Sequence, residues 1–227
     1  MKQVDFKTPK TARYFTLGTL NKKTKNIWIV CHGYAQLANH FLNWFKAIDN
    51  DENFIVAPEA LHRFYWKGFD GMVVASWMTK EDRLNDIADY VNYLDEVTKS
   101  ILSQANENVN IHVLGFSQGG STVCRWVTQT DLKFTSLTLW AGAFPEDIDY
   151  FEKKELFNQL NLHLVIGDDD PFYNEEKIET QKKTLTDKQI NYNMIRFNGR
   201  HKVLPSPLLE LEKSLQSKNN IKSENCD

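Results

Sequence analysis

A serine flanked by glycines has the residue types and spacing that most directly indicate chemistry. Gly115, Ser117 and Gly119 form the pattern G-x-S-x-G. Residues 110–114 before it are predicted to form a short buried strand, and the residues after it to start a helix. This strand–turn–helix context is that of a nucleophile elbow, in which a tight turn lifts the serine hydroxyl above the sheet. Glycines are required because side-chain carbons would clash in so tight a turn.

The same turn also predicts where negative charge would be stabilised. The backbone N–H of Gln118, directly after the serine, points to where an oxyanion would form after attack on a carbonyl carbon. Ser117 is therefore a candidate nucleophile. The alternative is that Ser117 is an ordinary residue of an elbow-like turn.

A serine hydroxyl needs a base to take its proton and a third group to orient that base. The sequence offers both after Ser117. His201 follows a predicted strand at 192–197, and three consecutive aspartates, residues 168–170, follow a predicted strand at 162–166. Loops at the carboxyl ends of parallel strands meet at one edge of the sheet, so these groups can converge. Spacing alone does not decide which of the three aspartates is the acid.

The elements that must position these residues alternate between strands and helices. Apolar runs predict strands, which lie at 12–20, 26–31, 54–58, 110–114, 136–140, 162–166 and 192–197. Helical spacing predicts helices, which lie at 36–48, 80–103, from 120 onward, 175–185 and 206–215. This alternation predicts an α/β fold with a mainly parallel central sheet covered by helices on both faces.

The clearest helix is predicted at residues 80–103. Its apolar residues recur at steps of three and four, so they share one face. Thr79 and Asp82 before it resemble a capping box, with aspartate in the acidic position.

Four motifs make the chain similar to α/β hydrolases of the phospholipase/carboxylesterase group, which includes acyl-protein thioesterases and small bacterial carboxylesterases. They are His32-Gly33-Tyr34, the run Gly115–Gly120, the run Gly167–Pro171 and Gly199-Arg200-His201. They occur in the order of that family and span nearly the whole chain. The resemblance implies an α/β-hydrolase fold without a large cap domain.

The resemblance also assigns the acid and the base. The aspartate before proline in the family's G-x-x-D-P motif falls on Asp170. The family's G-H dipeptide falls on His201, with Arg200 inserted between the glycine and the histidine. The implied catalytic residues are therefore Ser117, Asp170 and His201.

The oxyanion loop of the family, H-G-x-G, matches residues 32–35 except that its second glycine is Ala35 here. The resemblance implies that the backbone amides of Tyr34 and Gln118 bind the oxyanion. His32 is expected to brace this loop rather than to react.

The segment 61–78 is rich in aromatic residues, shows neither helical nor strand periodicity and follows a strand edge. It is interpreted either as the lining of an acyl or alcohol pocket or as a loop that folds over the sheet to complete the core. The candidate pocket residues are Phe64, Tyr65, Trp66 and Trp77, with His40 and His62 as further candidates. No insertion is long enough for an elaborate lid, so small or medium acyl esters are favoured.

Composition excludes several classes of function. The 227 residues are 41% hydrophobic and 25% charged, with a net charge of -3. This mild acidity gives no reason to expect nucleic acid or an anionic membrane as a partner. No stretch approaches the roughly 18 apolar residues of a membrane span. Without a signal-like N-terminus, the chain is expected to be cytoplasmic.

The three cysteines, Cys31, Cys124 and Cys226, form neither a disulfide framework nor a metal pattern. No metal-binding motif is present, so neither a metal nor a cofactor is expected.

The sequence thus predicts a single domain at residues 1–216 and a frayed polar tail at 217–227. The favoured function is a serine hydrolase that cleaves small or medium carboxylic esters, or thioesters, through an acyl-enzyme on Ser117. It would act on a small-molecule ester or acyl substrate as a monomer or homodimer. The alternatives are a serine peptidase or acyl-peptide hydrolase of the same fold, and a binding protein that kept the fold without catalysis.

Overall fold

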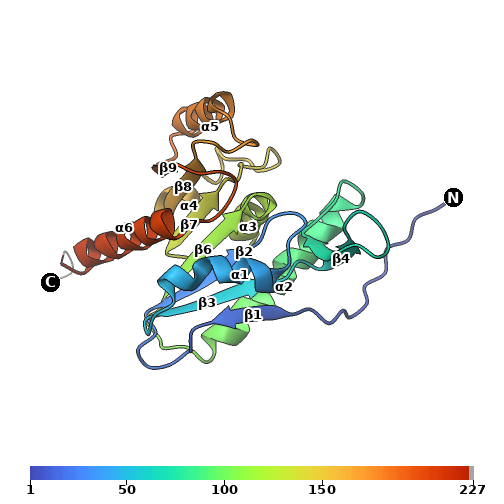
Figure 1. The fold of residues 1–227 in the computed structure, drawn as a ribbon, viewed down its shortest axis with the longest axis horizontal. Helices are drawn as coiled ribbons and strands as arrows, with labels where there is room; N and C mark the ends of the chain where they lie inside the picture. The colour runs from blue at the N-terminus through green and yellow to red at the C-terminus, as the bar shows by residue number, and fades with distance from the viewer. Residues whose placement is uncertain (225–227) are drawn as a thin grey trace.

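A seven-stranded sheet forms the centre of the computed structural model, which describes the backbone of residues 1–224 and the side chains of residues 1–217. The strands follow the order β1-β3-β2-β6-β7-β8-β9 (Figure 1). Their bounds are β1 Tyr14–Leu17, β2 Asn26–Cys31, β3 Asn53–Pro58, β6 Asn110–Phe116, β7 Ser136–Trp140, β8 Asn161–Gly167 and β9 Asn193–Phe197. All neighbouring pairs are parallel except β1 with β3. The predicted mainly parallel sheet is confirmed.

Helices cover both faces of this sheet, as the sequence predicts. One face packs against α2, α3, α4 and α5, and the other against α1, the 3-10 helix η1 and α6 (Figure 1). Their bounds are α1 Ala38–Leu42, η1 Asn43–Ile48, α2 Arg83–Leu102, α3 Gln118–Gln129, α4 Lys154–Gln159, α5 Glu175–Asp187 and α6 Pro205–Glu224.

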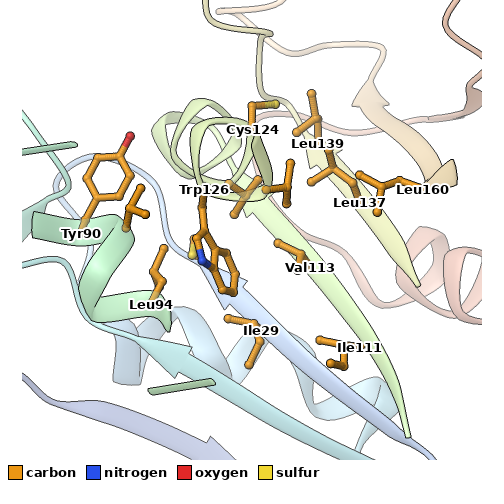
Figure 2. Packing of buried hydrophobic residues seen from close by; sticks show 14 of the residues in the cluster. Ile29, Tyr90, Leu94, Ile111, Val113, Cys124, Trp126, Leu137, Leu139 and Leu160 are labelled. Carbon is orange, nitrogen blue, oxygen red and sulfur yellow. The ribbon is translucent and has the colours of Figure 1, made fainter. Parts of the chain in front are cut away.

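Alternation along the central strands divides the core into two layers. In β2, Ile27 and Ile29 face the α2–α3 side while Trp28 and Val30 face the α1–α6 side, and all are buried. Burial on both faces explains why this strand reads as a continuous apolar run. Figure 2 shows Trp126 of α3 filling the space between α2 and the sheet. The core therefore fixes α3, and with it the turn that precedes α3.

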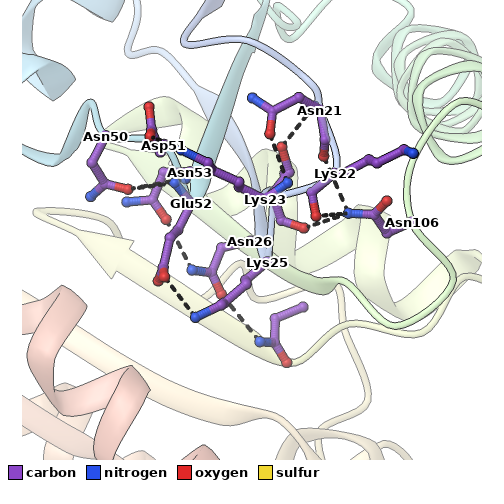
Figure 3. A network of polar contacts seen from close by, with 12 residues as sticks. Asn21, Lys22, Lys23, Lys25, Asn26, Asn50, Asp51, Glu52, Asn53 and Asn106 are labelled. Carbon is purple, nitrogen blue, oxygen red and sulfur yellow. Dashed lines mark hydrogen bonds and ion pairs between the residues drawn. The ribbon is translucent and has the colours of Figure 1, made fainter.

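A polar network closes the amino ends of the central strands. Asn26 of β2 bonds both Asn53 of β3 and Asn110 of β6, and Asn106 donates to the backbone carbonyls of the turn before β2 (Figure 3). Lys25 pairs with Glu52 at the same edge. The starts of the strands are thus held in register. The candidate site lies at the opposite edge of the sheet, at the carboxyl ends of the strands.

The segment 61–78 differs from its predicted irregular structure. It contains an antiparallel hairpin of β4, His62–Tyr65, and β5, Val73–Ser76. The sequence does not show the alternation of polar and apolar residues that is typical of a strand. The reason is that large aromatic residues occupy both faces of β4, which is mostly exposed.

Several helix boundaries also differ from the sequence prediction. The helix predicted at 36–48 is split into α1 and η1, and the short helix α4 is missed by the periodicity. The predicted capping box is wrong: Asp82 precedes α2 in a left-handed conformation and its side chain makes no capping hydrogen bond. Instead, the N–H of Thr79 donates to the carboxylate of Asp86.

The C-terminal helix α6 continues to Glu224, past Ser217, where the sequence predicts a frayed tail to begin. No proline or glycine lies in this stretch to end the helix. The rest of the predicted tail, residues 225–227, lies outside the described residues.

Candidate active site

The turn at Ser117 has the strained geometry of a nucleophile elbow. Ser117 lies between β6 and α3 with φ 53° and ψ −116°, a backbone conformation that residues other than glycine rarely adopt. Its N–H donates to the carbonyl of Trp140 at 2.9 Å. A Cβ on Gly115 or on Gly119 would lie 2.2 Å from a backbone oxygen, so both positions require glycine. This packing explains the glycine spacing seen in the sequence.

The loops after β8 and β9 bring Asp170 and His201 together. His201 Nδ1 lies 2.7 Å from Asp170 Oδ2, and the Asp170 side chain is fully buried while that of His201 is 18% exposed. The other carboxylate oxygen of Asp170 accepts the N–H of Phe172 at 2.8 Å. Because Nδ1 faces a carboxylate, it carries the proton, which leaves Nε2 as the basic nitrogen.

The other two aspartates of the run are placed differently. Asp168 is exposed and pairs with Arg196 at 2.7 Å. Asp169 is exposed, and its N–H donates to the carbonyl of Gly199. Of the three acids that spacing could not separate, Asp170 contacts the histidine.

Two phenylalanines place the His201 ring at the elbow. The ring lies 4.7 Å from that of Phe116, the residue before Ser117, and 4.8 Å from that of Phe172. Within the described part of the chain, no hydrogen bond joins Ser117 to His201. Such bonds commonly tighten only when substrate is bound.

The loop after β2 supplies unused backbone amides beside the elbow. Among residues 1–217, the N–H groups of Tyr34 and Gln118 have no hydrogen-bond acceptor. Gln118 opens α3, where the first N–H groups have no partner in the helix and favour negative charge. Ala35 adopts φ 58° where the family motif has glycine. Its N–H donates to the carbonyl of Ala75 in the hairpin, and the N–H of Ala75 donates to the carbonyl of Gln36. The hairpin therefore helps to hold this loop.

His32 braces the loop from below. It is fully buried, its Nδ1 contacts the carbonyl of Gly33 at 2.8 Å, and its Nε2 accepts the N–H of Ala60 at 3.1 Å. Burial lowers the pKa of His32 to about 4, so the ring is neutral near pH 7. This arrangement agrees with the bracing role expected from the sequence.

The side chain of Gln118 ties the elbow to the hairpin, a contact that sequence reasoning missed. Its oxygen accepts the N–H of Trp77, and its nitrogen donates to Ser76 Oγ and to the carbonyl of Met78. Nothing in the sequence indicated this contact, because Gln118 occupies a variable position of G-x-S-x-G and its partners lie about 40 residues earlier in the chain.

The aromatic candidates for the pocket divide into two groups. Phe64 and Trp66 pack around the half-exposed ring of Tyr34, and Tyr65 is 55% exposed. Trp77 is instead fully buried in the core and donates its Nε1 to the carbonyl of His32 at 2.8 Å. Its assignment as a pocket residue is therefore corrected. Trp77 helps to complete the core, which was the alternative interpretation of this segment.

Two cavities border the oxyanion loop. One, of about 370 Å³, is lined by Tyr34, Phe64 and His62, and His62 pairs with Asp86 at 2.9 Å. The other, of about 450 Å³, includes Ala35, Trp44 and Met72 in its walls. The full linings are Tyr34, His62, Phe64, Ser76, Thr79, Glu81 and Asp86 for the first, and Ala35, Gln36, Leu37, His40, Phe41, Trp44, Met72, Val73 and Val74 for the second.

The described residues hold no group of three or more histidine, cysteine, aspartate or glutamate side chains that could bind a metal ion. No helix within residues 1–224 is long and apolar enough to cross a membrane.

Solved structures with the same fold come from plants and bacteria. Acyl-protein thioesterase 2 of Zea mays superposes with a TM-score of 0.70 at 15% identity, covering 91% of this chain and 99% of that one. A phospholipase/carboxylesterase from Dyadobacter fermentans gives a TM-score of 0.64 at 18% identity, covering 91% and 97%. The carboxylesterase of Bacillus cereus gives 0.64 at 16% identity, covering 91% and 94%. These similarities confirm the α/β-hydrolase fold without a large cap.

No curated protein sequence matches the chain. The sequence model of one family, described as phospholipase/carboxylesterase, matches residues 15–219, which include the elbow and both loops that meet at His201. The chain belongs to the phospholipase/carboxylesterase family of α/β hydrolases.

Proposed function

We propose that this protein is a serine hydrolase that cleaves small or medium carboxylic esters, or thioesters, through an acyl-enzyme on Ser117. The observation that carries the proposal is the pairing of His201 with the buried Asp170 at 2.7 Å, with the His201 ring packed against Phe116 beside the strained Ser117 turn. These are the base and the orienting acid that a serine nucleophile needs. Membership of a hydrolase family supports the same reaction class.

The first half of the reaction forms the acyl-enzyme. His201 Nε2 takes the hydroxyl proton of Ser117 while Oγ bonds to the carbonyl carbon of the substrate. The resulting oxyanion accepts hydrogen bonds from the backbone amides of Tyr34 and Gln118, each worth about 3 kcal/mol of transition-state stabilisation. The protonated His201 then gives its proton to the leaving oxygen or sulfur as the bond from that atom to the carbonyl carbon breaks.

The second half releases the acid. Water gives a proton to His201 and attacks the acyl carbon, and the Ser117 oxygen leaves with that proton. Asp170 keeps the Nδ1 proton in place and stabilises the imidazolium in both halves. Because the Asp170 side chain is fully buried, water competes little for this hydrogen bond.

Substrate size follows from the cavities beside the oxyanion loop. Their volumes, about 450 and 370 Å³, fall in the lower part of the usual range for small-molecule sites. Both are lined partly by the hairpin, which replaces any larger lid. These dimensions favour short or medium acyl groups over long ones.

The test is hydrolysis of p-nitrophenyl esters of increasing acyl length by the wild type and by Ser117→Ala. We expect the variant to lose activity by a factor of roughly 10³ or more, because the nucleophile is removed. Ser121→Ala, one helical turn further along α3, is the matched control and should keep the wild-type rate. Labelling of the wild type, but not of Ser117→Ala, by a fluorophosphonate would confirm the nucleophile independently of the ester chosen.

A folded wild type that neither hydrolyses any of these esters nor reacts with the fluorophosphonate would contradict the proposal and favour a binding protein. Labelling without ester hydrolysis would instead favour a peptidase, which peptide p-nitroanilides would test.

A further inference from the structure

A third cavity, of about 490 Å³, opens between the loop after β7 and helix α5. Its walls include Phe144 on the loop, Tyr173 just after the acid loop, and Gln181 on α5. None of these residues was singled out by the sequence analysis as part of a site.

Gln181 is the unusual residue of this cavity. It lies on the inner face of α5 with Ile178 and Leu185, where an apolar residue is expected, and is only 8% exposed. Its amide nitrogen has no hydrogen-bond partner among the described residues. Burying an unpaired amide is unfavourable, so a ligand atom that accepts this hydrogen bond would be recognised strongly. Because Gln181 lies in the wall of the cavity, a ligand bound there would lie beside this amide.

Four other polar side chains of the lining have partners within the protein, whereas Glu146, Asn174 and Glu176 are exposed to solvent. The hydroxyls of Thr180 and Thr184 donate to carbonyls one turn earlier in α5. Tyr173 donates to the carbonyl of Gly142. Lys177 donates to the carbonyl of Phe172 at 2.9 Å. Gln181 is therefore the buried polar side chain of the lining that has an unpaired hydrogen-bonding atom.

Charge restricts the ligand further. Glu146 and Glu176 line the cavity, and the ammonium group of Lys177 is held by a protein carbonyl. The two carboxylates outnumber the one ammonium group, so the cavity disfavours an anionic ligand. Ala143, Phe144 and Tyr173 provide apolar surface. The cavity thus suits a neutral, partly apolar group that carries a carbonyl oxygen.

The position of the cavity identifies which part of a substrate it would receive. In the sheet, β6 ends directly before Ser117. It separates β2 and β3, which lead to the candidate oxyanion loop and the hairpin, from β7, β8 and β9. The cavity and His201 both lie on the β7–β9 side. Figure 1 shows α5 and β4 well apart, with α3 between them.

The leaving atom must be close to His201, because this histidine gives it a proton. The ring of Phe172 packs against His201, and the carbonyl of the same residue accepts the bond from Lys177 in the cavity wall. Contacts through Phe172 therefore link His201 to the wall of this cavity.

We infer that the cavity between the β7 loop and α5 binds the leaving-group arm of the substrate, and that it selects a neutral arm with a carbonyl oxygen that accepts a hydrogen bond from Gln181. This inference rests on the proposed function and adds the chemistry of the alcohol or thiol part of the substrate.

The kinetic test compares two esters with the same acyl group. In 2-acetamidoethyl butyrate the leaving alcohol has a carbonyl in its arm, and in pentyl butyrate the arm has the same chain length without it. Release of butyric acid is followed by pH-stat titration for the wild type and for Gln181→Met, which keeps the side-chain length. We expect the ratio of the two kcat/KM values to fall by about 3- to 10-fold in the variant, the effect of losing one neutral hydrogen bond.

Gln216→Met, the same substitution at an exposed position of α6, is the control and should leave that ratio unchanged. Thermal unfolding of both variants checks that they are folded. Comparing ratios within each variant removes any general effect on the rate. An unchanged ratio in folded Gln181→Met would overturn the leaving-group assignment.

A binding test separates this inference from the proposed function. The product alcohol, N-(2-hydroxyethyl)acetamide, is added to ¹⁵N-labelled Ser117→Ala protein, and the side-chain NH₂ signals of Gln181 are followed by NMR. We expect these signals to move. If they stay fixed at the highest concentration that the protein tolerates, the cavity is not the site. If they move although the wild type hydrolyses no ester, the binding site stands while the proposed function and the leaving-group role fail.

Discussion

Three consecutive aspartates have different surroundings in the fold. Asp168, Asp169 and Asp170 share a residue type and a loop, yet only Asp170 turns inward to His201, while Asp168 pairs with Arg196 at the surface. Burial gives the inward carboxylate its role, because hydrogen bonds strengthen when water is excluded. The run therefore provides a matched internal comparison for the proposed mechanism.

Asp170→Asn is expected to lower kcat on a p-nitrophenyl ester by about 10³- to 10⁴-fold. The amide would hold His201 in the wrong tautomer without changing the shape of the site. Asp168→Asn, two residues away, breaks only an exposed ion pair and should change kcat less than about twofold. Steady-state kinetics of the two variants side by side make the comparison. Equal losses in both would contradict the assignment of Asp170 as the orienting acid.

Side-chain hydrogen bonds attach the hairpin β4–β5 to the rest of the fold. The side chain of Gln118 contacts Ser76, Trp77 and Met78, and Trp77 bonds to the carbonyl of His32. The hairpin is thus tied both to the elbow and to the oxyanion loop. Its two short strands lie outside the central sheet, so these ties help to fix it, together with the backbone bonds between Ala75 and residues 35–36.

Gln118→Leu is expected to loosen the hairpin while leaving the core intact. The variant keeps the backbone amide of residue 118 but removes the hydrogen bonds to residues 76–78. Amide hydrogen exchange of these residues should speed up by about 10-fold or more, since about 1 kcal/mol is lost per bond. Exchange in β2 and β6 should stay at wild-type rates, as an internal control. Unchanged protection at residues 76–78 would mean that core packing of Trp77 alone holds the hairpin.

Buried neutral histidines make the stability of the whole molecule depend on pH. His112 of β6 is almost fully buried, bonds Ser136 and Asn26, and has its pKa lowered to about 3 by burial. In the unfolded chain its pKa is about 6.5. Between these values the unfolded state binds a proton that the folded state does not, so stability falls as pH drops below about 6.5.

The free energy of unfolding, measured by urea denaturation, is therefore expected to decrease between pH 7 and pH 4.5. His32, with a pKa lowered to about 4, contributes in the same direction. In His112→Gln the slope in this window should be smaller than in the wild type by up to about 1.4 kcal/mol per pH unit. An exposed control, His40→Gln, should keep the wild-type slope. A slope that His112→Gln leaves unchanged would contradict a neutral buried His112.

The sequence determined the parallel sheet, the helices on both its faces and the Ser–Asp–His order along the chain. Each of these is written in local patterns: apolar runs for β2 and β7, three-and-four spacing for α2, and glycines where the Ser117 turn admits no Cβ. Such signals survive in sequence because they depend on neighbours within a few residues.

The spacing of the three aspartates left their roles open, and the resemblance pointed to Asp170, which the structure places against His201. The tertiary structure alone decided that Trp77 belongs to the core and that the segment 61–78 forms a hairpin. It also placed Gln181, an unremarkable residue in a polar helix, at the wall of a cavity. These outcomes depend on contacts between segments distant in the chain. The direction in which a loop side chain turns is fixed by those contacts, whereas residue type and spacing fix only where the loop lies.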